Sequence, residues 1–271
     1  MPPLPAVGQL LVAPTPALRP YVASYVGFDV SGPPGVHLGV PSSALVAVIS
    51  LSDPLHVSPS RFTAMAGGLT TRPVAICHKG RLYGLKLSLT PLGARALYGR
   101  PASALSDDLV PLVDLLGHFG AELVERLGTA VTWSARFAVL DELLLRLVRR
   151  AENERYVRLV RPEVLEAWGR LVASRGRLQV ASLASELGWS RRHLSREFRA
   201  ELGLTPKTAA RVIRFERAHQ LATAAESLSW AEVSTDAGYT DQAHLVRDWG
   251  EFTGCSPAAW RRAEVLVGAA Q

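Results

Sequence analysis

The chain has 271 residues, a length that predicts two domains. Hydrophobic residues make up 48% and charged residues 20% of the sequence, which is enough apolar material for real cores and excludes a disordered chain. A net charge of +6 is compatible with a nucleic-acid partner. The two cysteines, Cys77 and Cys255, lie in different predicted domains without metal-ligand spacing, so we expect reduced thiols.

No targeting or membrane segment is expected. The apolar first residues contain no basic group and are interrupted by prolines, which argues against a signal peptide. The uncharged run of residues 30–52 also contains prolines and makes a poor membrane span. We therefore expect a cytoplasmic protein without a membrane partner.

Short apolar segments between glycine and proline turns predict several strands in the N-terminal half. The expected strands are residues 21–30, 44–52, 61–66, 72–78 and 81–89. Such a series is typical of a small sandwich or barrel. The apolar period then becomes helical, and we expect helices at residues 92–98 and 134–151.

Residues 81–89 alternate, which places Tyr83, Leu85, Leu87 and Leu89 on one strand face and Lys86 on the other. Lys86 and His37 are candidates for binding an anionic effector in a barrel mouth; a solvated strand face is the alternative. A metal centre needs converging imidazoles and a carboxylate, but this half has no His-x-His pair and few acidic residues. We expect no metal, no cofactor and no catalytic site, with the scattered histidines facing solvent.

In the C-terminal half, a helix is expected from Pro162 to about Ser174, and residues 179–202 then predict two short helices joined by a tight turn. The first helix ends at Gly188, where a left-handed backbone costs little, and Ser190 can cap the second helix. Its inward positions are Leu194, Phe198 and Leu202, and its outer face is basic. The pattern is typical of a helix-turn-helix, although a single copy also fits an ordinary amphipathic hairpin.

A second copy of the pattern favours the helix-turn-helix. It begins at Trp230, about 50 positions later, with a turn at Gly238, a cap at Thr240 and buried Leu245 and Trp249. A helix over residues 206–224 separates the two copies. Two recognition helices held about 34 Å apart on one face would enter successive major grooves of DNA.

The C-terminal residues resemble the DNA-binding domain of AraC/XylS-type transcriptional regulators over roughly residues 161–263. The resemblance rests on Leu183-Ala184, Gly188-Trp189-Ser190, Leu194, Phe198, Gly203, Thr205-Pro206, Arg214, Ala218, Gly238-Tyr239, Asp241, Gly254 and Ser256-Pro257. Residues 70–105 resemble more weakly the N-terminal half of actinobacterial regulators of this type. The resemblance implies an α+β chain, with a cupin-like sensing and dimerisation barrel at residues 1–155 and an all-α double helix-turn-helix domain at residues 156–271.

The resemblance also assigns roles to exposed side chains. The base-reading positions are Arg192, Ser195 and Arg196 in the first motif, and Gln242, Ala243, Val246 and Arg247 in the second. Arginine pairs with guanine, glutamine with adenine, and small apolar side chains contact the thymine methyl. Arg191, Arg199 and Lys207 are candidates for phosphate contacts. Double-stranded DNA is the implied partner, and the resemblance allows an effector, RNA polymerase and a second copy of the chain as further partners.

Some features depart from the family or stay open. Trp249 stands where the family has phenylalanine and Gly250 where it has a basic residue, so the second motif is expected to bind DNA less tightly. The apolar stripe of Leu140, Leu144 and Leu147 predicts either a dimer interface or packing within its own domain. The remaining alternatives are an effector-independent dimeric regulator and a protein-interaction module. An alkylation-repair enzyme is excluded because the N-terminal half has a single cysteine.

Overall fold

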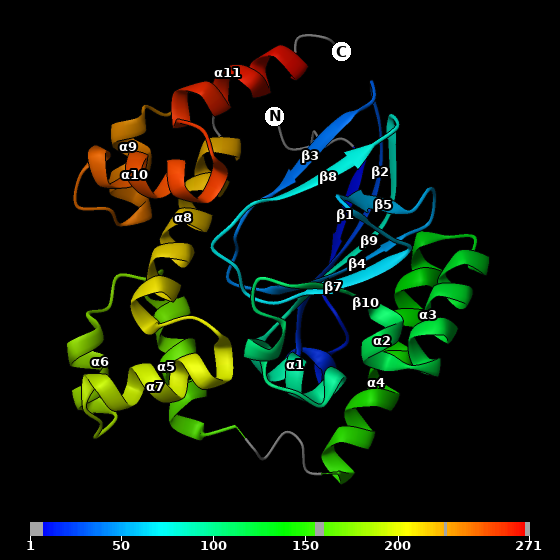
Figure 1. Cartoon of the computed structure of the whole chain (residues 1–271), viewed down its shortest axis with the longest axis horizontal. Helices are drawn as coiled ribbons and strands as arrows, with labels where there is room; N and C mark the ends of the chain where they lie inside the picture. Colours follow the sequence, from blue (N-terminus) through cyan, green and yellow to red (C-terminus); the bar gives the residue numbers. More distant parts are fainter. Residues whose placement is uncertain (1–7, 155–159, 225–226, 269–271) are drawn as a thin grey trace.

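The computed structural model describes residues 8–154, 160–224 and 227–268. A β-rich N-terminal part and an all-helical C-terminal part lie side by side (Figure 1). The domain boundary predicted at residues 155 and 156 falls in residues 155–159, outside the described residues. Within the described ranges, no helix is long and apolar enough to cross a membrane.

The N-terminal part contains one six-stranded and one four-stranded antiparallel sheet. The strands are β1 (Gln9–Val12), β2 (Val22–Ser31), β3 (Gly35–Gly39), β4 (Leu45–Ser50), β5 (Leu55–Val57), β6 (Ser60–Phe62), β7 (Ala64–Gly67), β8 (Val74–His78), β9 (Arg81–Leu89) and β10 (Leu109–Pro111). Their order is β1-β2-β9-β4-β7-β10 in the larger sheet and β3-β8-β5-β6 in the smaller one. Each predicted strand range overlaps a strand, and the predicted range 81–89 coincides with β9. The single strand predicted at residues 61–66 is wrong, because two strands, β6 and β7, overlap this range. The strands that sequence reasoning missed, such as β1 and β10, are too short for alternation to show.

The two sheets pack face to face and are not closed into a barrel. A cluster that includes Phe62, Met65, Ile76 and Leu82 fills the space between them. Leu85 and its alternate neighbours on β9 point the other way, towards the helices. The predicted barrel is therefore wrong, whereas the sandwich alternative agrees with the structure. Alternation along a strand shows which face is buried, but it does not show whether the edge strands join.

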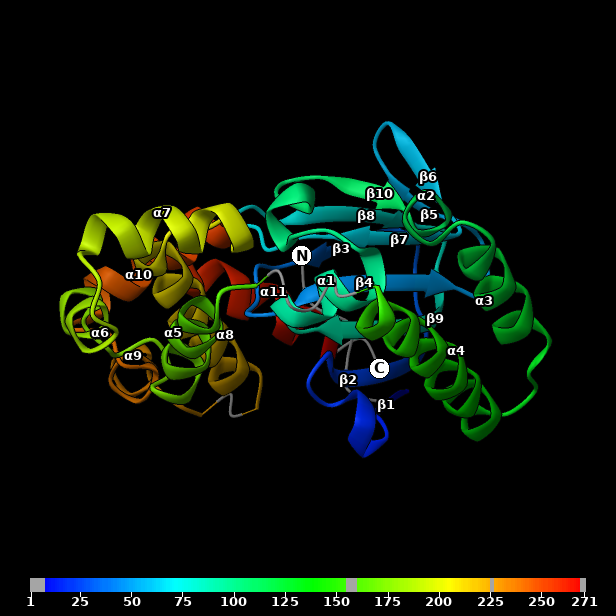
Figure 2. The same ribbon diagram turned by 90° about the horizontal axis from the view of Figure 1, so that it is seen from below.

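Helices cover the outer face of the six-stranded sheet (Figure 2). They are α1 (Pro91–Tyr98), α2 (Leu112–Leu116), α3 (His118–Thr129) and α4 (Trp133–Asn153). On α4, Leu140, Leu144 and Leu147 are 0%, 2% and 8% exposed within the single chain, so the stripe packs within its own domain. The hydroxyl of Tyr25 on β2 donates to Asp141 Oδ1 at 2.9 Å, which ties the sheet to α4.

The described residues of the C-terminal part form helices joined by short turns, without a strand. Its helices are α5 (Pro162–Ala173), α6 (Val180–Glu186), α7 (Arg191–Leu202), α8 (Pro206–Ala224), α9 (Trp230–Ala237), α10 (Gln242–Thr253) and α11 (Pro257–Gly268). The long helix α8 runs between the group α5–α7 and the group α9–α11 (Figure 1). This arrangement agrees with the predicted pair of motifs joined by a spacer helix.

Helix α8 contributes to two separate hydrophobic cores. Ala209 and Ile213 belong to a core that joins the first motif to the helices and sheet of the N-terminal part. Phe215 and Ala218 belong to a second core built around α9 and α10. The first motif is thus continuous with the N-terminal part, while the second motif has a core of its own.

Polar contacts hold the first motif to the N-terminal part. Arg95 on α1 forms a bidentate ion pair with Glu201 on α7, at 2.9 and 2.7 Å. The hydroxyl of Ser103 donates to the carbonyl of Ala200 at 2.6 Å. Because the Arg95 and Glu201 side chains are only 15% and 10% exposed, this ion pair is largely shielded from solvent screening.

Truncation of α4 at its buried stripe tests the packing of the N-terminal part. We expect Leu140→Ala to lower the free energy of unfolding by about 2–5 kcal/mol, because it leaves a cavity in the core. Leu11→Ala is the control: Leu11 is 71% exposed on β1, so its loss should change stability by less than about 0.5 kcal/mol. Urea unfolding measures both variants, and equal, small effects would contradict the packing of α4 described above.

Candidate nucleic-acid interface

The turns of the two motifs have the same backbone hydrogen bonds. In the first turn, the amide of Trp189 donates to the carbonyl of Ala184 at 2.9 Å. In the second turn, the amide of Tyr239 donates to the carbonyl of Ser234 at 3.0 Å. Gly188 and Gly238 lie between these partners with φ of 70° and 84°, a conformation that side chains with a Cβ rarely adopt. The predicted turns are confirmed at both glycines.

The caps show where the two motifs differ. Ser190 caps α7 by accepting from the amide of His193 at 3.2 Å, as the sequence predicts. The predicted cap at Thr240 is wrong, because Asp241 accepts from the amide of His244 at 2.7 Å. One additional residue therefore separates turn from helix in the second motif. A fixed repeat of about 50 positions does not account for that residue.

The outer face of α7 is open to solvent. Arg191, Arg192, Arg196 and Arg199 are exposed, Ser195 is half-buried, and Lys207 is exposed at the start of α8. Among the described residues, Arg191, Arg192 and Arg199 have no ion-pair partner. The candidate base-reading and phosphate-contacting side chains of the first motif therefore share one accessible, positively charged surface.

Arg196 differs from these arginines because it is already held in place. Its Nε donates to Glu197 Oε1 at 2.9 Å, and one of its terminal nitrogens lies 3.0 Å from His193 Nδ1. Arg161 also pairs with Glu197 at 3.0 Å. The hydrogen bond from Arg196, together with the charge of Arg161, lowers the pKa of Glu197. The Arg196 guanidinium is thus oriented before any ligand arrives.

The outer face of α10 is less basic. Gln242, Ala243, Val246 and Arg247 are exposed. Counted from the first residue of each recognition helix, Arg247 corresponds to Arg196 and Gly250 to Arg199. A Cβ placed on the Gly250 backbone would meet nothing within 4 Å. A glycine is therefore not required for packing at position 250. The second motif has no basic side chain at this position, where the first motif has Arg199.

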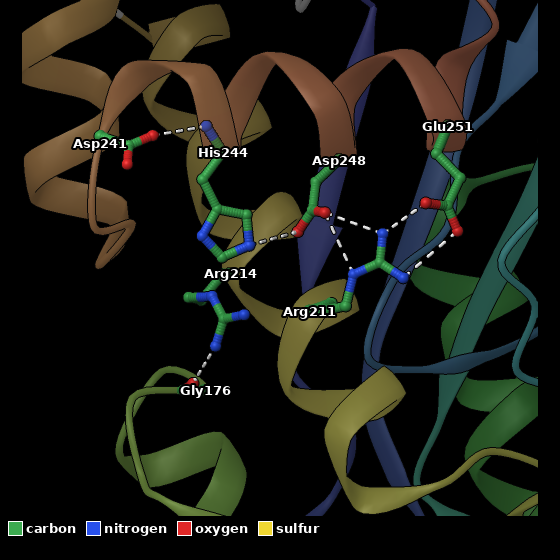
Figure 3. A network of polar contacts seen from close by, with 7 residues as sticks. All are labelled: Gly176, Arg211, Arg214, Asp241, His244, Asp248 and Glu251. Carbon is green, nitrogen blue, oxygen red and sulfur yellow. Dashed lines mark hydrogen bonds and ion pairs between the residues drawn. The ribbon is translucent and has the colours of Figure 1, made fainter.

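A buried ion-pair network attaches α10 to the spacer helix (Figure 3). Arg211 on α8 donates from Nε and a terminal nitrogen to Asp248 Oδ1, at 3.1 and 2.8 Å. Arg211 also bonds Glu251 at 3.3 Å, and His244 Nε2 lies 3.8 Å from the second Asp248 oxygen. Since the Asp248 side chain is 2% exposed, its charge depends on these partners. The network fixes how α10 lies against α8.

Two further arginines connect the motifs with each other. Arg214 on α8 donates to the carbonyl of Gly176, in the turn after α5, at 2.6 Å (Figure 3). Arg177 from the same turn donates to the carbonyl of Asp236 on α9 at 2.8 Å. The turn between α5 and α6 therefore bridges the first motif, the spacer and the second motif.

Trp249 is accommodated by an aromatic cluster. It is fully buried, and its ring lies 5.1 to 5.4 Å from the rings of Phe215, Trp230 and Trp260. His219 stacks on it at 5.8 Å, and burial lowers the pKa of this histidine to about 4. The Trp249 ring, which is larger than the phenylalanine ring expected at this position, is therefore part of the second core.

The two candidate effector residues lie on opposite sheets. Lys86 lies on the inner face of β9 and His37 on β3 of the opposite sheet. Burial, followed by the charges of Lys86 and His78, lowers the pKa of His37 to about 4, so the expectation of a solvent-facing histidine is wrong for His37. Desolvation of the Lys86 amine lowers its pKa, and the charge of Glu216 on α8 partly offsets this effect. Part of the Lys86 side chain is nevertheless accessible to solvent. Among the described residues, no cluster of three metal-ligating side chains is present.

Comparisons with known proteins agree with this architecture. Residues 183–263 match a family model described as a helix-turn-helix domain. No curated protein matches the chain. ToxT from Vibrio cholerae matches with a TM-score of 0.52 and 11% identity, over 94% of this chain and 98% of that one. Unsaturated fatty acid-bound ToxT from V. cholerae strain SCE256 matches with a TM-score of 0.51 and 10% identity, over 95% and 96%. The DNA-binding domain of AdpA, solved with a target DNA, has 26% identity and a TM-score of 0.35, over 37% of this chain and 91% of that one.

The family model and the geometry of the two motifs define the class of the C-terminal domain. Residues 183–263 belong to a helix-turn-helix domain, and a β-rich N-terminal domain precedes it. Over its whole length it has a ToxT-like fold.

The Arg211–Asp248 pair can be tested by removing one of its charges and then both. We expect Arg211→Met to destabilise the protein by about 3–5 kcal/mol, because it leaves a buried carboxylate without its cation. The double variant with Asp248→Leu removes both charges and should recover most of that loss. Arg191→Met, at an exposed arginine, is the control. Urea unfolding followed by tryptophan fluorescence measures all four proteins, and a double variant no more stable than Arg211→Met would rule out this interpretation.

Proposed function

We propose that this protein is a sequence-specific DNA-binding regulator whose helices α7 and α10 enter successive major grooves. The observation that carries the proposal is the pair of matching glycine turns, each followed by a helix with an exposed outer face, on opposite ends of one spacer helix. Buried networks around Arg211 and Arg214 hold the two helices in a fixed relation. A preformed arrangement of this kind avoids the entropy cost of ordering the reading surface on DNA.

The proposed contacts follow from exposure and chemistry. Arg192, Ser195 and Arg196 read bases from the first motif, and Gln242, Ala243, Val246 and Arg247 read bases from the second. Arg191, Arg199 and Lys207 contact phosphates and position the protein. The exposed positive surface of α7 and the nearly neutral surface of α10 support an unequal contribution, with the first motif dominant.

We further propose that an anionic small molecule regulates the protein by binding near Lys86 and His37. Support comes from the position of Lys86, whose charge contributes to lowering the pKa of His37 in the opposite sheet and of His219 on α8. An anion beside Lys86 would therefore act on the helix that carries both motifs. ToxT, which shares the fold, has been solved with an unsaturated fatty acid bound. The same proposal places the protein in the actinobacterial subgroup of AraC-type regulators and in the cytoplasm. It also includes dimerisation and contact with RNA polymerase.

Selection of bound sequences from a random DNA pool tests the proposed function. The full chain should enrich a site with two unlike half-motifs about one helical turn apart. Binding should fall steeply with salt, because phosphate contacts release counterions. Failure to enrich any sequence, with or without fractionated cell metabolites, would overturn the proposal in favour of a protein-interaction module.

The ranking of the two motifs can be tested with arginine variants. We expect Arg196→Ala to abolish specific binding and Arg247→Ala only to weaken it, since a bidentate arginine–guanine pair contributes about 1–3 kcal/mol. Arg72→Ala, at an exposed arginine of the N-terminal part, serves as the control. Gel-shift titration on the selected site at one salt concentration measures the losses; equal losses for the two recognition-helix variants would contradict the ranking.

Gly250 allows a gain-of-function test. Gly250→Arg should increase DNA affinity and steepen the salt dependence by about one unit, because it restores a phosphate contact at the position that matches Arg199. Gly250→Ala separates helix stability from charge: it should stabilise the protein by about 1 kcal/mol without changing the salt slope. Unchanged affinity for Gly250→Arg would show that this face of α10 does not approach the phosphates.

A further inference from the structure

The two recognition helices carry the same short pattern at the same positions. It reads HLSRE at residues 193–197 and HLVRD at residues 244–248, the third to seventh residues of α7 and of α10. In each copy the arginine and the acid follow the histidine by three and four positions, a spacing at which side chains on a helix surface can meet. The two copies nevertheless make different contacts, and the difference concerns the arginine.

In α7 the arginine is restrained along one side of its guanidinium group. Arg196 Nε donates to Glu197 Oε1 at 2.9 Å, and Arg196 Nη2 lies 2.8 Å from the same oxygen and 3.0 Å from His193 Nδ1. A guanidinium nitrogen can only donate, so His193 Nδ1 is the acceptor and its ring is neutral, with the proton on Nε2. Nη1 is the one guanidinium nitrogen of Arg196 without a partner among the described residues.

The two groups that restrain Arg196 are themselves held in place. The Glu197 side chain is 18% exposed, and its second carboxylate oxygen pairs with Arg161, at the start of α5, at 3.0 Å. The half-buried ring of His193 lies edge-on to the ring of Trp189, with 4.4 Å between the ring centroids. Rotation of the Arg196 guanidinium would therefore break contacts with partners that cannot follow it.

In α10 the same pattern leaves the arginine unrestrained. The Asp248 carboxylate accepts from Arg211 on α8 at 2.8 Å and is buried there. His244 Nε2 lies 3.8 Å from Asp248, so this histidine also faces the acid. Arg247 is exposed and has no hydrogen-bond or ion-pair partner among the described residues. The second motif thus has the residues of the pattern without the restraint on its arginine.

We propose that His193 and Glu197 are positioning residues that give Arg196 its preference for guanine, an inference that rests on the proposed function, in which Arg196 reads a base. An unrestrained arginine loses side-chain freedom when it binds, and it can turn to another acceptor when guanine is replaced. An arginine restrained at Nε and Nη2 does neither, so replacement of guanine costs the whole contact. Arg247, which lacks the restraint, discriminates less sharply between bases.

The restraint can be measured in the free protein, without DNA. In the chain labelled with ¹⁵N-arginine, we expect a higher ¹⁵Nε order parameter for Arg196 than for Arg247, the two signals being assigned from arginine-to-lysine variants. Glu197→Gln should lower the value for Arg196 towards that of Arg247. Glu166→Gln, at an exposed glutamate that pairs with Arg170 on α5, is the control and should change neither. Equal order parameters for the two arginines in the unaltered chain would overturn the proposal.

Discrimination is measured as the ratio of the affinities for the selected DNA site and for the same site with the guanine replaced. The guanine read by Arg196 is the one whose replacement no longer matters in Arg196→Ala. We expect His193→Leu and Glu197→Gln each to lower the ratio by about threefold to tenfold, as expected when one long side chain must be ordered on binding. The ratio is used because loss of the Glu197 charge strengthens binding to all DNA.

The outcomes of these gel-shift titrations separate this inference from the proposed function. A guanine preference that depends on Arg196 but is unchanged in both His193→Leu and Glu197→Gln would refute the positioning role and leave the proposed function standing. A preference that does not depend on Arg196 at any guanine would refute the base-reading role of Arg196 and this inference with it.

A pH profile with a conservative variant tests the acceptor role of His193. The charged groups around its ring are Arg196, Glu197 and Arg161, and the hydrogen bond from Arg196, together with the charge of Arg161, lowers the pKa of Glu197, so the carboxylate stays ionised. Protonation of the ring removes the acceptor, so the wild-type ratio should fall from about pH 8 to about pH 5.5, the range in which histidines ordinarily gain a proton.

His193→Asn places an amide oxygen at the position of Nδ1, an acceptor that does not titrate. This variant should keep most of the discrimination and lose its pH dependence. A wild-type ratio that does not change with pH, or an equal pH dependence in His193→Asn, would refute the role of His193.

Discussion

Helix α8 must fill two hydrophobic cores at once, and the rest of the structure depends on this constraint. Ala209 and Ile213 pack towards the first motif and the N-terminal part, whereas Phe215 and Ala218 pack towards the second motif. Rotation of α8 would disrupt both sets of contacts, since close-packed interiors do not deform continuously. The two recognition helices are therefore placed relative to each other by one rigid element.

Polar contacts supply the orientation that apolar packing leaves undetermined. The Asp248 carboxylate is almost fully buried, so α10 is held where Arg211 can reach it. Arg214 and Arg177 give similar directional links through the turn between α5 and α6. Breaking one partner of such a pair costs far more than the pair contributes, so these contacts favour a single arrangement of the motifs over nearby alternatives.

The two motifs have unequal relations to the N-terminal part. The first shares its core and is held by the shielded Arg95–Glu201 pair. The second has its own core, against which Val40 of the N-terminal part packs, and the amide of Ser43 donates to Glu216 on the spacer helix α8. A change in the N-terminal part therefore reaches α7 through its packing and α10 mainly through α8. The motif with the more basic face is also the one in direct contact with the N-terminal part.

The sequence by itself determined the features that depend on local order. The positions of β9, the turns at Gly188 and Gly238, the Ser190 cap and the long spacer helix all follow from periodicity and backbone preferences within a few residues. Only the tertiary structure decided the features that join distant residues: the open sheets in place of a barrel, the Asp241 cap after one extra residue, the burial of Asp248 against Arg211, and the nearness of Lys86 to His37. Strand edges and buried ion pairs are selected by contacts between segments far apart in the chain, and a pattern of neighbouring residues carries no information about them.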